Sequence, residues 1–294
     1  MTIFITASLP IQAKAEKQSD SSSDSPFSTN SSSFSSDRGL AQEWEPSDSF
    51  MAYKQNYFLA FLHSSDPDQI PTSPNPFYQV QHPLQLQDKE VKFQISLKHL
   101  LAEYKGAGAL WVGYTQLAFW QLFNQSTGQP FREVVYEPEV IYSLRPDNFS
   151  ILNFGAVHQS NGDAAPFERS WNRLYFEPGI QINKSSDQRI ILQMRWWIIE
   201  DKNDNPDIGD YQGFRELNLR YIQDGGWKIN VMSRILSTQL DIAAPLSVWM
   251  LQPVDRSSRN TVDFHLQYFN GYGEGLLEYN QSHTSLGVGL SFPF

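Results

Sequence analysis

The sequence contains no cysteine among its 294 residues. This absence excludes a disulfide framework and any metal site built from thiolates. The chain also has no cluster of lysine and arginine. Its formal net charge is −10 and its pI is about 5.0. A groove that follows nucleic-acid phosphates needs a basic surface, so we expect no nucleic-acid partner.

The chain also lacks the run of about 18 apolar residues that a membrane-spanning helix requires, and its mean hydropathy is −0.44. These two properties leave a membrane β-barrel open, because only alternate residues of a barrel strand face lipid. Aromatic residues make up 14% of the chain, which is typical of a β-rich protein.

The N-terminal segment differs in composition from the rest. Residues 1–15 are mostly apolar and end in Ala13-Lys14-Ala15, the small-x-small form of a secretory cleavage site. A basic start is missing and Pro10 interrupts the apolar part, so we interpret this stretch as a truncated signal peptide, favoured over a disordered tail. Residues 16–46 are rich in serine and predict a disordered leader. The folded domain is then expected to span 47–294.

The remainder of the chain consists of short alternating segments separated by turn residues. Each has around ten residues, the length with which a tilted strand crosses the hydrocarbon layer. Their even number and their length predict an all-β, 12-stranded antiparallel transmembrane β-barrel. The candidate strands are 53–61, 90–99, 109–123, 133–144, 148–160, 170–182, 188–200, 211–222, 226–236, 244–251, 262–271 and 285–294.

The alternation has a consistent sense, with apolar residues on one face and small or polar residues on the other. A soluble β-sandwich that serves as a binding module would also alternate and is kept as an alternative. The polar faces mix opposite charges, as in Glu216, Asn218 and Arg220, which suits the filled lumen of a narrow barrel. The final amphipathic strand ends on Phe294, as is common in bacterial outer-membrane barrels.

One hairpin carries residue types that could perform catalysis. His158 and Ser160 are two residues apart and would project to the same side of a strand. A histidine beside a serine hydroxyl can act as a general base and make the serine a nucleophile. Asn161-Gly162 predicts a turn that brings the strand from Ser170 back alongside, so Asn172 would stand near His158 and could orient its ring.

Strand phase places this candidate triad on the apolar face of both strands, which in a membrane barrel is the face that contacts lipid. A nucleophile at the rim of that wall is positioned to meet an acyl ester at the membrane interface. Serine and histidine two residues apart also occur by chance in a serine-rich chain. A catalytically inert barrel, serving as a passive channel or a structural protein, is therefore the alternative.

At these residues the sequence resembles the outer membrane phospholipase A family, over the whole folded part of the chain. The segments that match the family are His158-Gln159-Ser160-Asn161-Gly162, Arg169-Ser170-Trp171-Asn172-Arg173-Leu174-Tyr175, Lys92-Phe93-Gln94-Ile95-Ser96-Leu97, Tyr114-Thr115-Gln116, Phe131-Arg132-Glu133, Tyr136-Glu137-Pro138, Asp204-Asn205-Pro206-Asp207-Ile208 and Gly271-Tyr272-Gly273-Glu274.

The resemblance implies a barrel in the bacterial outer membrane that hydrolyses acyl esters of phospholipids at the A1 and A2 positions, with lysophospholipids as further substrates. It assigns Ser160 as the nucleophile, His158 as the general base and acid, and Asn172 as the residue that orients His158. It also implies activation by formation of a homodimer. The family buries the residue matching Gln94 at that dimer interface, whereas strand phase alone places Gln94 in the lumen.

The resemblance further implies that calcium is required. Family ligands come from the loop after the serine and from the partner subunit. This loop has Asp163 where the family uses a backbone carbonyl, Glu168 where the family has a serine, and Ala165 where the family has an acid. Asp204 keeps another acid of the family. The implied metal ligands are therefore Asp163, Glu168 and Asp204, and carboxylates are ligands that calcium prefers.

Overall fold

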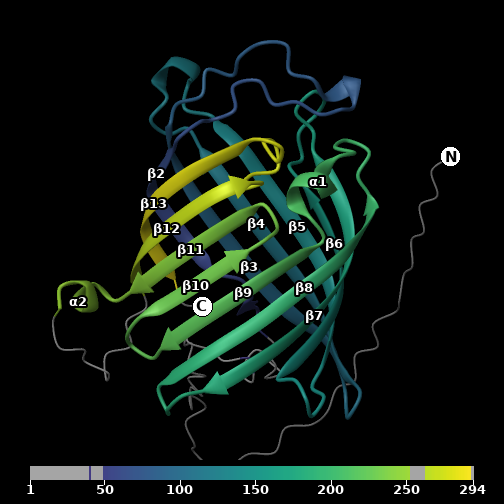
Figure 1. Cartoon of the computed structure of the whole chain (residues 1–294), viewed down its shortest axis with the longest axis vertical. Coiled ribbons are helices and arrows are strands. Elements are labelled where there is room, and N and C mark those ends of the chain that lie inside the picture. The colour runs from purple at the N-terminus through teal and green to yellow at the C-terminus, as the bar shows by residue number, and fades with distance from the viewer. Residues whose placement is uncertain (1–39, 41–48, 252–261, 293–294) are drawn as a thin grey trace, which may run out of the picture. The chain divides into compact units, whose positions relative to one another are not determined.

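The computed structural model describes residues 40, 49–251 and 262–292, and strands dominate it (Figure 1). No helix in these ranges has the length and apolar character needed to cross a membrane. The elements are β1 (Met51–Ala52), β2 (Asn56–Ser64), η2 (Pro76–Tyr78), β3 (Lys89–Tyr104), β4 (Gly108–Trp120), η3 (Gln125–Thr127), β5 (Phe131–Leu144), β6 (Ile151–Ser160), β7 (Ser170–Asn183), β8 (Gln188–Asp201), α1 (Ile208–Gln212), β9 (Arg215–Gln223), β10 (Lys228–Ser233), β11 (Ser237–Ala244), α2 (Leu246–Trp249), β12 (Asp263–Tyr272) and β13 (Ser282–Phe292).

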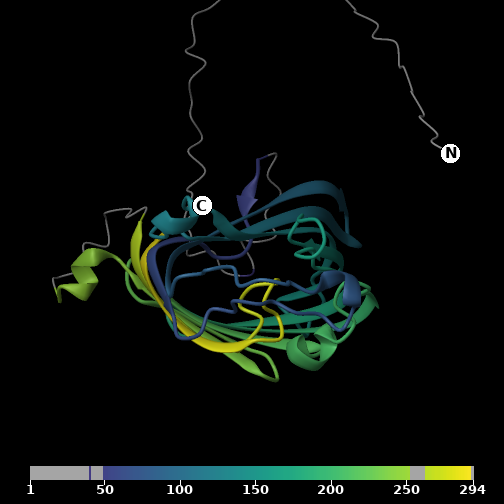
Figure 2. The same cartoon turned by 90° about the horizontal axis from the view of Figure 1, so that it is seen from above.

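The strands β2 to β13 form a closed antiparallel barrel. Each strand pairs with its neighbours in sequence, and β13 pairs back onto β2. Figure 2 shows the wall curving around the lumen. The short β1 pairs with β3, at residues of β3 that follow those paired with β2. Closure leaves no long unpaired edge, and it confirms the predicted 12-stranded barrel.

The two faces of the wall have opposite chemistry. On β13 the outward Leu286, Leu290 and Phe292 are exposed, whereas Ser285 and Ser291 are buried. Elsewhere the side chains buried inside include many charged ones. A soluble sandwich would bury the apolar face and expose the charged one, so the predicted apolar-out arrangement is confirmed and the sandwich alternative is excluded.

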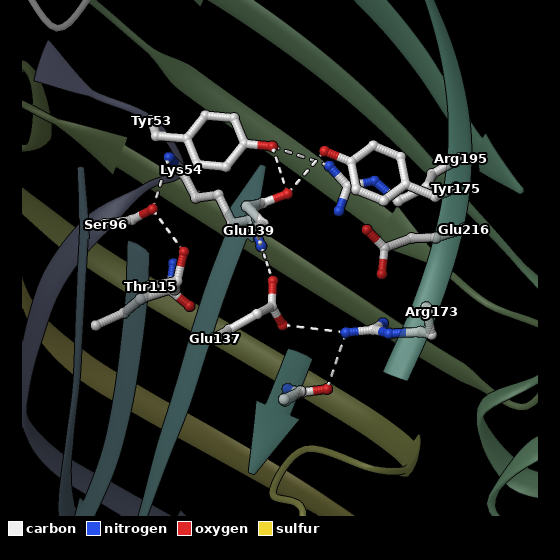
Figure 3. A network of polar contacts seen from close by, with 12 residues as sticks. Tyr53, Lys54, Ser96, Thr115, Glu137, Glu139, Arg173, Tyr175, Arg195 and Glu216 are labelled. Atoms are coloured by element: carbon white, nitrogen blue, oxygen red, sulfur yellow. Dashed lines mark hydrogen bonds and ion pairs between the residues drawn. The ribbon is translucent and has the colours of Figure 1, made fainter. Parts of the chain in front are cut away.

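Charged and aromatic side chains from β5, β7 and β8 form part of a network of polar contacts inside the barrel (Figure 3). The Tyr175 hydroxyl donates to Glu139 Oε2 at 2.7 Å, and Arg173 Nη2 lies 3.3 Å from Glu137 Oε2. Lys54 also pairs with Glu137. A cavity of about 380 Å³ remains, and Gln94 is among the residues that line it. The lumen position that strand phase gave to Gln94 is the one observed.

One predicted strand, 244–251, is wrong. The structure places β11 earlier, at Ser237–Ala244, and Pro245 then leads into α2. Alternation is present in β11, where Thr238, Leu240 and Ile242 share one face. Residues 244–251 are instead a nearly continuous apolar run, which has no strand period. The strand predicted from 211 likewise begins only at Arg215, because α1 occupies the start of that range.

The predicted signal peptide and most of the predicted leader lie outside the described residues, as does Phe294. Leu40 is described, and it falls within the range assigned to the leader. Its side chain is fully buried against Ile151, Ile191 and Ile222. Its N–H donates to Gln181 Oε1 at 2.7 Å. At Leu40 the chain is thus already packed against barrel residues, before the expected start of the domain at residue 47.

Candidate active site

The β6–β7 hairpin brings His158 and Asn172 together. They are opposite each other in the antiparallel register, and His158 Nδ1 lies 2.7 Å from Asn172 Oδ1. An amide oxygen only accepts a hydrogen bond, so the ring donates from Nδ1. The other ring nitrogen, Nε2, is then unprotonated in the neutral imidazole and can accept a proton.

Ser160 lies two residues beyond His158, at the end of β6. It is half-buried and faces Ser170 of β7 in register, with Tyr136 of β5 on its other side. Among the described contacts, the His158 ring bonds Asn172 and makes no hydrogen bond to Ser160. Hydrogen bonds of this kind are often long in an unliganded site and shorten when substrate binds.

The surroundings of these residues are apolar and outward. Phe154 and Leu174 share their side of the wall and are exposed, whereas Val157 and Trp171, on the opposite side, are buried. His158 is itself exposed. The structure therefore places the predicted triad on the outer wall, at the rim beside the connecting loop.

The loop between β6 and β7 is held by Asn161, which is buried. Its Nδ2 donates to the Phe167 carbonyl at 2.7 Å, and its Oδ1 accepts from the Arg169 N–H at 2.9 Å. Gly162 follows with a φ of +70°, a conformation that glycine adopts without strain. The side chain at the predicted turn thus closes the loop that separates Ser160 from Asn172.

Arg169 joins this loop to the long connection between β2 and β3. Its guanidinium is fully buried and donates to the carbonyls of Pro166, Glu168 and Tyr78, at 3.1, 2.8 and 3.3 Å. Burial lowers the pKa of Arg169, since charge is disfavoured away from water. Asn161 was predicted only as part of a turn, and no role was predicted for Tyr78 or for Arg169, which lies inside a matched motif.

Two of the three predicted calcium ligands lie close to Tyr78. Its hydroxyl has a raised pKa, caused first by desolvation and then by the neighbouring carboxylates of Asp204 and Glu168. Asp204 Oδ2 also accepts from the Ser170 hydroxyl, and its main-chain carbonyl accepts from Ser73 at 2.5 Å. The β2–β3 connection therefore contributes to the site end of the barrel, which Figure 1 shows at the top.

Asp163, the third predicted ligand, is exposed in the loop, and partial desolvation of its carboxylate raises its pKa. Within the described ranges, no three His, Asp or Glu side chains are grouped to hold a metal ion. The Asp204 and Glu168 carboxylates are the hard oxygen donors that calcium prefers, but calcium takes about six to eight oxygens. These carboxylates fit calcium in kind, but they are fewer than the oxygens that a calcium shell requires.

Comparison with known sequences identifies relatives along most of the chain. The family model for phospholipase A1 matches residues 37–292. A relative from Neisseria meningitidis serogroup B is 32% identical over 252 residues, which are 80% of this chain and 63% of the relative. The phospholipase A1 of Escherichia coli K12 is 30% identical over 216 residues, 68% of each chain. The chain thus spans just under two thirds of the Neisseria relative.

Solved structures share the architecture. The Salmonella typhi outer membrane phospholipase, solved as a dimer with bound calcium, has a TM-score of 0.69 at 26% identity and covers 86% of this chain and 95% of that one. The outer membrane phospholipase A of Escherichia coli has a TM-score of 0.66 at 25% identity and covers 83% of this chain and 98% of that one.

Proposed function

Because this chain belongs to the phospholipase A1 family and shares its β-barrel architecture with outer membrane phospholipases, we propose that it is an outer-membrane enzyme, a calcium-dependent phospholipase that uses Ser160, His158 and Asn172. It hydrolyses acyl esters of phospholipids at the A1 and A2 positions and also accepts lysophospholipids. Its active form is a homodimer. The observation that carries the proposal is the 2.7 Å contact between His158 Nδ1 and Asn172 Oδ1 on the outer wall.

In this mechanism His158 Nε2 takes the proton from the Ser160 hydroxyl as Ser160 Oγ attacks the ester carbonyl carbon. The tetrahedral intermediate collapses, and His158 gives its proton to the departing lysolipid alcohol. Water then attacks the acyl-serine with His158 again as base, which releases the fatty acid and restores the serine. Asn172 keeps the ring in the tautomer that has Nε2 free, and this makes it a positioning residue.

The location explains the choice of asparagine. The wall around the site carries exposed apolar side chains such as Phe154, Leu174 and Phe176, against which an acyl chain can lie. A carboxylate on this wall would lose hydration when lipid covers it, at a cost that a neutral amide avoids. The amide thus provides the hydrogen bond to His158 without a desolvated charge.

Calcium would be held by Asp204 and Glu168, with Asp163 at the rim of the same loop. When bound it supplies positive charge that stabilises a developing oxyanion. The described donors of one chain are too few for calcium, and the related Salmonella typhi protein is a dimer with bound calcium. A second copy of this chain would complete the coordination, which links metal binding to dimer formation.

The decisive experiment measures phospholipid hydrolysis by purified protein in detergent, with calcium and with a chelator, for the wild type and Ser160→Ala. We expect hydrolysis only by the wild type with calcium. The matched control is Thr238→Ala, which removes an exposed hydroxyl from β11 and should leave the rate unchanged. Equal turnover by wild type and Ser160→Ala would overturn the assignment of the nucleophile, and indifference to the chelator would overturn the calcium requirement.

Two further measurements separate the finer claims. Phospholipids labelled in one acyl chain or the other report whether both ester positions are cleaved, and a lysophospholipid tests the single-chain substrate. Chemical cross-linking under the assay conditions should give a dimer whose yield follows activity as calcium is varied. No hydrolysis of any substrate would instead favour the inert barrel.

A further inference from the structure

The end of the barrel opposite the candidate site has one connection unlike the others. Four hairpins there turn through short segments, at 105–107, 145–150, 184–187 and 224–227, whereas the β11–β12 connection runs from 245 to 262. Its described first part contains α2. In Figures 1 and 2 this helix lies outside the barrel wall, at the left of both views.

Aromatic contacts fix α2 against the wall. The Trp249 ring lies 4.9 Å from that of Trp227 and 5.3 Å from that of Phe264, both edge-on. Phe264 is on β12 between the buried Asp263 and His265, so it faces outward. Within α2, the side chain of Val248 is buried. The helix is therefore a packed feature of the outer surface.

The other side of α2 presents large apolar side chains that the described structure leaves uncovered. Leu246 is 60% exposed, Met250 61% and Leu251 91%. Met250 caps the C-terminus of α2 and its N–H donates to the Leu246 carbonyl at 3.0 Å, so the two side chains lie on one side of this turn. Leu251 has a φ of +55°, which a leucine rarely adopts. Residues 244–251 include no charged side chain.

This surface is continuous with the apolar outer wall. In register, Ala244 at the end of β11 is opposite Phe264, and Phe264 is opposite Leu290 of β13. Leu290 is outward and exposed. The chain thus enters α2 beside the end of the lipid-facing wall. Tryptophan rings such as those of Trp227 and Trp249 are enriched where membrane meets water.

We propose that α2, with Leu246, Met250 and Leu251, is an interfacial anchor. It lies at the boundary between headgroups and acyl chains in the leaflet at the barrel end away from the candidate site. Its occupant is lipid, because the apolar face continues the lipid-facing wall, carries no charge and lies beside an aromatic cluster, as interfacial segments do. The proposal depends on the barrel spanning a membrane and is independent of the catalytic assignment.

The absence of native cysteine makes the test direct. Single variants Leu246→Cys, Met250→Cys and Leu251→Cys receive a spin label and are reconstituted in phosphatidylcholine vesicles, and label relaxation by oxygen is compared with relaxation by a water-soluble nickel complex. Leu286→Cys on the outer wall is the lipid reference. Lys184→Cys, exposed in the β7–β8 turn at the same barrel end, is the water reference.

We expect the three labels to resemble the one at Leu286, with oxygen more effective than the nickel complex. Nickel accessibility like that at Lys184 would place α2 in water and overturn the proposal. Protection from both reagents would mean that protein covers the helix and would equally overturn it. If protection appears only at high protein-to-lipid ratio, a second copy is the occupant rather than lipid. Heat-modifiable gel mobility of each labelled variant confirms that the barrel is folded.

Discussion

The inner and outer faces of β6 and β7 differ in how densely their side chains are bonded. On the inner face, Arg173 pairs with Glu137, and the Tyr175 hydroxyl donates to Glu139, all away from water. On the outer face, the contact between His158 and Asn172 is the side-chain hydrogen bond of the proposed triad. Because alternate residues of a strand face opposite sides, stability and chemistry are separated within one hairpin.

The largest effect should come from the outer face and should appear in the rate alone. His158→Ala removes the proposed proton carrier and should lower kcat/KM about 10⁴-fold, about 5.5 kcal/mol of activation free energy. Because the ring is exposed and its hydrogen bond among the described residues is to Asn172, the free energy of unfolding in guanidinium should stay unchanged. The matched control is His63→Ala, which should keep full activity. His63 is an exposed histidine of β2, and its Nδ1 lies 3.3 Å from Asp88 Oδ2 in the β2–β3 connection.

The next effect belongs to the inner face and should appear in stability. Lys92 Nζ lies 2.8 Å from Glu274 Oε1, and both side chains are almost fully buried. Lys92→Met removes the ammonium from Glu274, whose carboxylate keeps its contact with His283 Nε2 at 2.7 Å, and should cost about 3–5 kcal/mol of unfolding free energy, with the activity of the folded protein retained.

The double variant Lys92→Met, Glu274→Gln removes the stranded charge and should recover part of that loss. Guanidinium unfolding of the single and double variants in detergent gives the comparison. A double variant less stable than the single one would show that the ion pair is not the source of the effect.

Much of this two-sided arrangement was predictable from the sequence, because the side chains of a strand alternate between its two faces. The period predicted which residues of β3, β9 and β13 face the lumen. It also put His158, Ser160 and Asn172 on the outer wall, since residues two apart share a strand face and the chain returns antiparallel after Asn161-Gly162. The prediction failed at 244–251, where an unbroken apolar run conceals the boundary between β11 and α2.

The site's supports could not be predicted in the same way, because they come from distant parts of the chain. Tyr78 contacts Arg169, and Ser73 contacts Asp204, both from the β2–β3 connection. Strand alternation does not predict the path of this connection. Carboxylates could be named as calcium ligands, but their grouping depends on loop folding. Arg169 joins the β6–β7 loop, which follows Ser160, to the β2–β3 connection.

Arg169 is accordingly expected to affect both rate and stability, at an intermediate size. Arg169→Lys keeps the charge but cannot reach all three carbonyls, and each hydrogen bond to a charged group is worth about 1.5–3 kcal/mol. We expect a stability loss of that order and a fall in kcat, because the loop next to Ser160 loosens. Unchanged kcat with lowered stability would show that the loop does not position the serine. The measurement pairs guanidinium unfolding with kinetics on the same preparation.

The smallest effect should come from Asn172→Ala. The amide contributes one neutral hydrogen bond to the ring, worth about 0.5–1.5 kcal/mol, so kcat should fall about tenfold or less with stability unchanged. If Asn172 acts only through His158, then adding Asn172→Ala to His158→Ala should lower the remaining rate no further. A further fall in the double variant would mean that Asn172 has a separate role, such as contact with the lipid. Asn172 lies on the outer wall, so its substitution should cost little unfolding free energy. In this it differs from the next residue, Arg173, which faces the lumen.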